Sequence, residues 1–266
     1  MLRGSNISQI MAVVAVYLFM YIPVIVLILF AFNDSPFIVF PISGLTLDWF
    51  SVVLTDKNIL TALWNSLIVA FFVTILSVVL GTMGALAIIR YKFRMRFLLA
   101  ALLFLPIIIP RTILGISFTT LQDFLDQSGN LTMVVLAQAV FCLPFAVIVI
   151  SSVLWRFDRS LEEASLDLYA GRVRTFTKVT LPLIKNGIMA GALICMILSF
   201  SEYTLTWFAS GHDQTLPLVI FAEYRYHLSP KINALSTLIV VANILIALAG
   251  EFIRSRGEKR LNNRVR

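Results

Sequence analysis

Long runs of apolar residues dominate the chain, and short polar stretches separate them. Six runs are long enough for a helix to cross the apolar core of a bilayer, which needs about 20 residues. The runs lie at about residues 7–32, 59–89, 97–121, 131–154, 183–207 and 234–253. They are continuous rather than alternating, and only helices or closed barrels satisfy their backbone groups in lipid. The pattern therefore predicts an all-α integral membrane protein with six transmembrane helices.

The composition supports a membrane protein rather than a soluble one. Of the 266 residues, 59% are hydrophobic and 13% are charged, with a mean hydropathy of +0.93. Soluble domains carry about 25% charged residues. The first run is too long for a cleaved signal peptide and has only Arg3 ahead of it, so we expect it to be a retained span. We expect residues 1–266 to form a single transmembrane domain.

The positive charges are concentrated in three stretches, at residues 90–96, 156–185 and 254–266. With six spans, all three stretches fall on the same side of the membrane. Because Lys and Arg are enriched in cytoplasmic loops, this side is predicted to be cytoplasmic, with both termini there. The net charge of +7 is thus explained by topology and does not indicate a nucleic-acid partner.

The cytoplasmic loop at about residues 156–185 has the pattern of a short helix. Ser160 followed by Glu163 matches a capping box, and Glu162 adds a second acid where the helix dipole favours negative charge. Gly171 can end the helix in a left-handed conformation. A second helical piece is expected at about residues 173–179.

One side of this short helix is apolar. Leu161, Ala164 and Leu168 recur at helical spacing. Such a face lies on the lipid surface, packs on the protein's own spans, or docks into a groove of a soluble partner. The residues alone leave these alternatives open.

The same loop resembles the EAA loop of bacterial ABC importer permeases, the binding-protein-dependent inner-membrane components. That pattern reads Glu-Ala-Ala, three residues, Gly, nine residues, Ile-x-Leu-Pro. This chain has Glu163-Ala164-Ser165, then Tyr169, then "VTLP" at residues 179–182. Tyr169 stands where Gly is usual, and a left-handed turn would be strained for Tyr. We therefore expect the turn to shift to Gly171.

The resemblance extends beyond the loop. The segments "FCLPFAVIVI" and "LPLVIFAEYRYHLSPKINALSTLIVV" resemble the second permease of spermidine/putrescine importers. The resemblance implies a MetI-like core in the bacterial inner membrane. It also implies a second permease subunit (identical or different), two cytoplasmic ATPase subunits and a periplasmic solute-binding protein as partners. The residues that it implies for ATPase coupling are Glu162, Glu163, Ala164, Ser165, Leu168, Tyr169 and Gly171.

No feature of the sequence indicates an enzyme. The chain has no G-x-x-x-x-G-K-[ST] phosphate loop, so we expect no bound cofactor; the resemblance places ATP and Mg on partner ATPase subunits. Cys142 and Cys195 lie in apolar runs and indicate neither a disulfide framework nor a metal site. His212 and His227 lie in the last outer loop, where we expect them to be solvated.

Two ionisable residues lie within the apolar runs, Arg111 in the third and Glu202 in the fifth. Such residues are candidates for a translocation path, or they pair with each other or face water at the outer end. Tyr203 and Trp207 lie beside Glu202 and complete the candidate path. Polar residues elsewhere in the runs are candidates for bonds between helices: Asn65, Gln138 and Asn243.

The expected solute is a polyamine such as spermidine or putrescine. Permeases that resemble this chain usually carry an acid where Arg111 stands, and a cation disfavours Arg at that position. An amino-acid-like, opine or phosphonate solute is therefore the alternative, since a zwitterion suits both Arg111 and Glu202. A secondary transporter driven by an ion gradient is a second alternative, because the third run is interrupted by Pro106 and Pro110.

Overall fold

The computed structural model describes residues 3–226 and 230–265, and side chains there except for residues 3–8, 226, 251 and 253–265. The backbone over these ranges is helical, with loops and one isolated bridge between Asn33 and Leu45. This confirms the all-α prediction. Two compact units divide the chain, residues 1–60 with 219–242 and residues 61–218 with 243–266.

The first unit contains α1 (Arg3–Ala31), α2 (Asp48–Thr55), most of α11 (Leu216–Tyr226) and the start of α12 (Pro230–Val265). The apolar part of α1, Gln9–Ala31, is long enough to cross a membrane, and none of its most apolar window is buried. A helix that is apolar on all sides and unburied is typical of a lipid-facing or partner-facing span.

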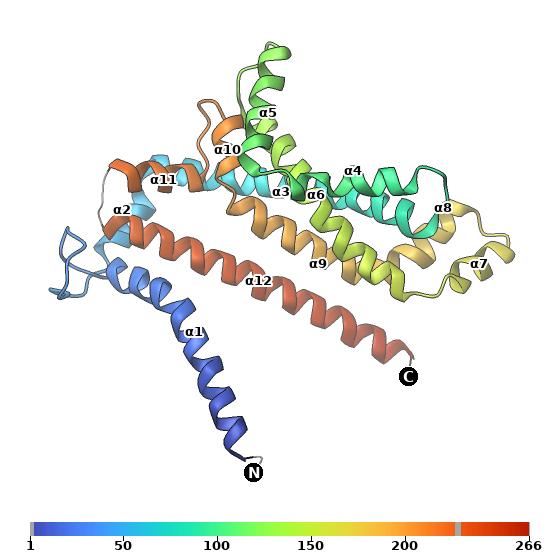
Figure 1. Ribbon diagram of the computed structural model, residues 1–266, viewed down its shortest axis with the longest axis horizontal. Coiled ribbons are helices and arrows are strands. Elements are labelled where there is room, and N and C mark those ends of the chain that lie inside the picture. The colour runs from blue at the N-terminus through green and yellow to red at the C-terminus, as the bar shows by residue number, and fades with distance from the viewer. Residues whose placement is uncertain (1–2, 227–229, 266) are drawn as a thin grey trace. The chain divides into compact units, whose positions relative to one another are not determined.

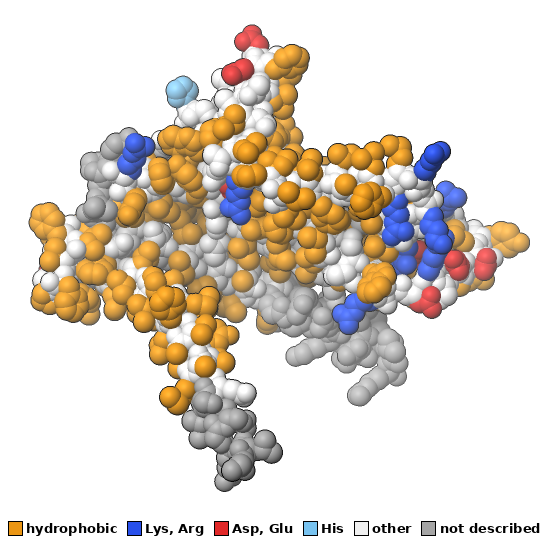
Figure 2. All heavy atoms as spheres, viewed as in Figure 1, with side chains coloured by type: hydrophobic (Ala, Val, Ile, Leu, Met, Phe, Trp, Pro, Cys, Tyr) orange, Lys and Arg blue, Asp and Glu red, His pale blue; other side chains and the backbone are white. Residues whose placement is uncertain are grey.

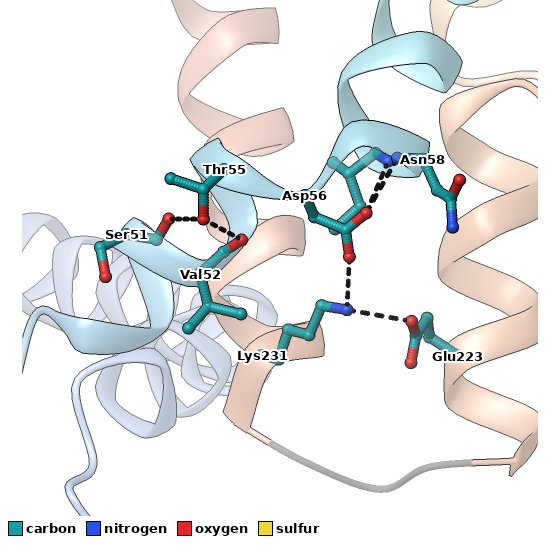
Figure 3. A network of polar contacts seen from close by, with 8 residues as sticks. Ser51, Val52, Thr55, Asp56, Asn58, Glu223 and Lys231 are labelled. Carbon is teal, nitrogen blue, oxygen red and sulfur yellow. Dashed lines mark hydrogen bonds and ion pairs between the residues drawn. The ribbon is translucent and has the colours of Figure 1, made fainter.

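A charged cluster joins the junction of α2 and α3 to α11 and α12 within the first unit. Figure 3 shows Lys231 directed between Asp56 and Glu223, and its Nζ lies 3.0 and 3.2 Å from their carboxylates. Asp56 also accepts the Asn58 N–H at 2.9 Å, at the start of α3. The Lys231 ammonium is the main cause that lowers the pKa of Asp56 from its ordinary value. One lysine thus holds three helices at this point.

The second unit contains the main hydrophobic core, and the rest of α12 also belongs to it. Its elements are the bulk of α3 (Lys57–Arg90), α4 (Arg96–Ile108), α5 (Arg111–Phe124), α6 (Leu131–Arg156), α7 (Ser160–Asp167), α8 (Arg172–Thr175), the π-helix η1 (Phe176–Thr180), α9 (Leu181–Phe200) and α10 (Thr204–Ala209). The core lies where α6 packs along α9, as Figure 1 shows.

Small residues allow α6 and α9 to approach closely. A side chain at Gly187 would meet Val153 at 2.9 Å, and one at Gly191 would contact Ile150. Cys142 and Cys195 are buried, free thiols at this contact, and the Cys195 Sγ donates to the Cys142 carbonyl at 3.6 Å. The prediction that neither cysteine forms a disulfide is confirmed. Close packing of small residues replaces the hydrophobic effect between helices in lipid.

The candidate spans largely follow the six apolar runs. Five described helices are long and apolar enough to cross a membrane, and the pair α4 and α5 adds a sixth if it is one span. These two helices are bent by 104°, and Figure 1 shows α5 leaving the direction of α4. Pro110 precedes α5 and lacks an N–H, and Ile109 before it is extended, so the helix stops there. Pro106, in contrast, lies inside α4.

The fifth run differs from its prediction at its end. The expected run to Trp207 is wrong, because α9 ends at Phe200 and Trp207 lies in the separate helix α10. The Glu202 carboxylate accepts the Leu205 N–H at 3.1 Å, which starts a new helix. A polar side chain that satisfies the first amides of α10 thus divides an apolar run.

Candidate functional site

The helix α7 begins differently from the predicted capping box. The Asp158 carboxylate accepts the Ser160 N–H at 3.0 Å, and Glu163 forms an ion pair with Arg159 at 3.1 Å. Arg159 already has helical backbone angles, so Ser160 lies inside the helix and cannot cap it. The capping box is therefore wrong, and Asp158 supplies the acceptor. This hydrogen bond lowers the pKa of Asp158 below its ordinary value.

The helix α7 ends at a left-handed Tyr169, with a φ of 59°. The Tyr169 N–H donates to the Leu166 carbonyl, and the Ala170 N–H donates to the Ser165 carbonyl. This is the hydrogen-bond pattern of a Schellman motif, with Tyr169 at the position that Gly usually takes. Gly171 is extended, with φ −63° and ψ 157°. The expected shift to Gly171 is wrong, because both bonds of the motif form at Tyr169.

The outer face of α7 is apolar and uncovered. Leu161 is 48% exposed, Leu168 is 82% exposed, and Ala164 between them is exposed. A groove of about 700 Å³ follows this face, and Arg174 and Lys178 line it together with the apolar residues. Figure 2 shows Lys and Arg side chains gathered around α7 and α8. The face has the form of a docking surface with a basic margin.

The inner face of α7 contacts the membrane helices. The Glu162 Oε1 accepts the Thr180 hydroxyl at 2.9 Å, and the Arg90 Nε lies 3.3 Å away as an ion pair without hydrogen-bond alignment. Ser165 shares a hydrogen bond of 3.0 Å with Thr175 of α8. The residues expected for coupling therefore divide into two sets, and Glu162 and Ser165 belong to the inner set.

Arg111 and Glu202 pair with each other. The Arg111 Nη1 lies 3.2 Å from the Glu202 Oε2, and the guanidinium lies 4.5 Å from the centre of the Phe141 ring. The Glu202 side chain is only 2% exposed, whereas the Arg111 side chain is 51% exposed. The two side chains therefore form an ion pair, with the cation at the surface and the anion buried, and the translocation path stays a prediction.

Aromatic side chains follow Glu202 along the chain, with Tyr203 directly before α10 and Trp207 within it. The rings of Tyr203 and Trp207 are tilted with their centres 6.0 Å apart, and Trp207 is 55% exposed. Gly115 of α5 lies against Phe208, where a Cβ would collide with the ring, so α5 and α10 pack closely. The four residues expected for a path thus belong to one region of the second unit.

The three polar candidates for bonds between helices have different roles. Gln138 of α6 donates to Thr206 of α10 at 2.8 Å and accepts from Ser199 of α9. Asn243 of α12 donates to Ser201 at 3.3 Å. Asn65 of α3 instead donates to the carbonyl of Gln214, in the loop before α11. The predicted bonds between helices are therefore confirmed only for Gln138, because Ser201 and Gln214 lie outside the helices.

Metal ligands do not gather in the part of the chain that the structure describes. No three His, Cys, Asp or Glu side chains there could hold an ion. His212 is exposed in a loop, as expected, and His227 lies outside the described residues.

Residues 77–266 match the family model of the binding-protein-dependent transport system inner membrane component. The chain belongs to this family. The spermidine/putrescine permease PotC of Escherichia coli (strain K12) is 31% identical over 254 residues, which are 95% of this chain and 94% of PotC. The putrescine permease PotI of the same organism is 32% identical over 252 residues, which are 91% of this chain and 89% of PotI.

Solved ABC transporters share the fold of this family member. A chain of a bacterial transporter that imports the polysaccharide alginate superposes with a TM-score of 0.73, at 17% identity, over 94% of this chain and 96% of that one. A chain of the methionine transporter MetNI superposes with a TM-score of 0.64, at 18% identity, over 76% of this chain and 99% of that one. These likenesses show the MetI-like fold.

Sequence reasoning missed two participants in the site of this transport component. Arg90 stands in a stretch that indicates topology only, and Thr180 has no pattern that marks it. Both reach Glu162 across long sequence separations of 72 and 18 residues, which spacing along one helix cannot predict. The sequence did contain one signal for this contact, because Glu162 lies off the apolar stripe of the amphipathic helix.

Proposed function

We propose that the chain is the transmembrane permease subunit of an ATP-driven importer in the bacterial inner membrane. It passes a polyamine such as spermidine or putrescine from a periplasmic binding protein to the cytoplasm. The single observation that carries the proposal is the 31% identity to PotC over 95% of the chain. The subunit is non-catalytic and binds no cofactor. ATP and Mg bind two partner ATPase subunits, and a second permease completes the pore.

The outer face of α7 supports the docking of an ATPase. Leu168 on this face is 82% exposed, and exposed apolar surface is unfavourable in water. Covering the face with a groove of a partner would lower the free energy. Arg174 and Lys178 beside it favour an acidic margin on the partner. The basic stretches of the loops favour the cytoplasmic side for this face, where ATP is available.

The region around Arg111 and Glu202 supports a solute path. Trp207 exposes its indole ring beside Tyr203, and aromatic faces attract ammonium groups. Ionisable side chains within membrane spans are costly and rare, so they are candidates for a functional site. These residues are the proposed lining of the path at its outer half.

A second candidate solute is favoured by one observation. Glu202 is buried and already paired, whereas half of the Arg111 side chain is exposed. The charge that an incoming solute meets is thus positive, which suits a carboxylate or phosphonate. An amino-acid-like, opine or phosphonate solute therefore remains the alternative within the same importer class.

Uptake in proteoliposomes tests the proposal. The complex with its binding protein, partner permease and ATPase is supplied with labelled spermidine, putrescine, an acidic amino acid or an alkylphosphonate. We expect uptake of a polyamine that requires internal ATP. Uptake of only the anionic solutes would select the second candidate. Uptake driven by a proton or sodium gradient without ATP would instead establish a secondary transporter.

A substitution on the outer face of α7 tests the docking itself. Ala164→Asp places a charge where the partner groove would bury it without a counter-ion, which costs several kcal/mol. We expect the ATPase to be lost from the purified complex while the chain stays inserted. Ala164→Ser is the matched control of similar size, and it should retain the ATPase. Equal retention of the ATPase in both variants would contradict docking and would favour contact of this face with the lipid surface.

A further inference from the structure

Glu162 faces away from the apolar surface of α7. Its side chain is 16% exposed, in contrast to 59% for the neighbouring Glu163. The two acids are adjacent on a helix of 3.6 residues per turn and so differ by about 100° in direction. Glu163 pairs with Arg159 of its own loop, whereas Glu162 reaches residues of other elements.

The partners of Glu162 lie at the ends of membrane helices. Arg90 is the last residue of α3, and its side chain is 12% exposed. The Arg90 Nη2 donates to the carbonyl of Phe157, the residue after α6, at 3.3 Å. Thr180 directly precedes α9 and is 4% exposed. One carboxylate and one guanidinium thus connect α7 to the ends of α3, α6 and α9.

The connection to α9 passes through an unusual backbone. Thr180 is the last residue of the π-helix η1, and η1 joins α8 to α9 without a loop. Single-turn π-helices are rare and occur often at functional sites. The Ser165–Thr175 hydrogen bond adds a second link from α7 to the same continuous segment. A displacement of α7 therefore acts on α9 through polar contacts at two points.

We propose that Glu162 is a positioning residue that transmits movement of α7 to α3, α6 and α9 during import. It does not contact the ATPase, and it acts through Arg90 and Thr180. This inference rests on the proposed function, because it requires an ATPase that moves α7. A charged contact with little exposure suits this role, because water screens it weakly.

The test separates transmission from docking and from folding. Glu162→Gln keeps an oxygen that accepts the Thr180 hydroxyl and removes the charge that faces Arg90. Thr180→Val removes only the hydroxyl. Asp167→Asn neutralises an exposed acid on the same helix and is the control. For each complex we measure ATPase retention, melting temperature, and solute taken up per ATP hydrolysed.

We expect Glu162→Gln to lower uptake per ATP about fivefold and Thr180→Val about twofold, with ATPase retention close to wild type. The melting temperature of Glu162→Gln should fall, because the largely buried Arg90 loses its counter-ion, whereas that of Thr180→Val should stay close to wild type. Asp167→Asn should match wild type. Unchanged uptake per ATP in Glu162→Gln overturns the inference. A fall only in proportion to lost ATPase or lost melting temperature also overturns it, because that is the effect of docking or folding.

Two further outcomes are decisive. If Glu162→Gln does not fold, Thr180→Val decides, and an unchanged ratio in that variant overturns the inference. If wild type shows no ATP-dependent uptake, the proposed function fails and the inference falls with it. If wild type imports the solute and both variants take up as much solute per ATP as wild type, only the inference is overturned. The proposed function is then unaffected.

Discussion

Tyr169 holds a backbone conformation that L-residues other than Gly, Asn and Asp seldom adopt. Its φ is 59°, and its side chain is 99% exposed. A left-handed residue costs roughly 1–2 kcal/mol, and the exposed ring recovers little of this within the chain. Strain of this kind persists at functional sites. The ring points out beside the groove along α7, so the ATPase is the partner that we expect it to contact.

The substitution Tyr169→Gly should separate the backbone strain at Tyr169 from the contact that its ring makes with the ATPase. Gly adopts the left-handed angle without strain, which stabilises the fold, but it also raises the conformational entropy of the unfolded chain. The free energy of unfolding should therefore rise by at most about 1 kcal/mol. Loss of an aromatic anchor should weaken ATPase binding about tenfold. Melting curves and ATPase retention measure the two effects. Tyr169→Ala is the control that loses the ring but keeps the strain. Wild-type retention in Tyr169→Gly would contradict a contact by the ring.

Arg111 and Glu202 should respond unequally to substitution. Arg111→Gln leaves a carboxylate that is 2% exposed without its counter-ion, and breaking a buried pair in this way costs about 3–5 kcal/mol. Glu202→Gln leaves a guanidinium that is half exposed and reaches water, and the amide oxygen still accepts the Leu205 N–H. We expect this variant to lose only about 1 kcal/mol.

Thermal unfolding of the purified complex measures this asymmetry. The double variant Arg111→Gln with Glu202→Gln should be more stable than Arg111→Gln alone, because no buried charge remains. Equal losses in the two single variants would show that both charges are buried in the assembled transporter. Uptake measured alongside reports whether the pair serves the path, since a purely structural pair leaves uptake per folded complex unchanged.

At the scale of elements, the start of α7 depends on a carboxylate. The Ser160 N–H bonds to Asp158 and lowers its pKa below the ordinary value of 3.8. A lowered pKa means that the ionised form stabilises the fold. The contribution is complete above pH 3.8 and is lost as the pH falls through the lowered pKa.

Hydrogen exchange in the first turn of α7 tests this contact. After correction for intrinsic rates, protection of the Ser160 amide should fall on acidification below about pH 4. Asp158→Asn keeps an oxygen acceptor but has no charge to lose, so its protection should not follow pH in this range. The difference between the two proteins isolates Asp158 from Glu162 and Glu163. Identical pH profiles would show that another group controls this turn.

The bounds of a helix were predictable from sequence where the length of an apolar run sets them. They were less predictable where a single polar contact ends or starts a helix. The runs at 59–89 and 131–154 differ by at most two residues at either end from α3 and α6. The end of α9 was missed, because the Glu202 carboxylate starts a new helix inside an apolar run. The Tyr169 turn was missed because steric preference favours Gly, whereas two backbone hydrogen bonds fix the turn two residues earlier.

The candidate site shows the same division. Periodicity identified the outer face of α7, since Leu161, Ala164 and Leu168 share one side of a helix. It could not identify the inner face, because Glu162 meets Arg90 and Thr180 from distant elements. Contacts between elements depend on how the helices pack, and a pattern along one helix carries no information about that packing.

At the scale of the whole molecule, the pair α4 and α5 decides how often the chain crosses the membrane. The pair α4 and α5, bent by 104°, is either one broken span or a re-entrant loop. A broken span gives six crossings and places residues 90–96 and α7 on the same side. A re-entrant pair gives five crossings and places them on opposite sides. Both stretches are rich in Arg and Lys, so the positive-inside rule favours six.

Three single cysteines decide between these topologies. We replace Cys142 and Cys195 with Ala and introduce Lys92→Cys, Ser128→Cys or Asp167→Cys, all at exposed positions. In intact cells, an impermeant maleimide should label only Ser128→Cys. The other two should react only after the membrane is opened, because the cytoplasmic loops carry the positive charge. Reaction of both Lys92→Cys and Ser128→Cys only after the membrane is opened, with Asp167→Cys labelled in intact cells, would establish the re-entrant pair. It would also place α7 outside the cytoplasm, beyond the reach of a cytoplasmic ATPase.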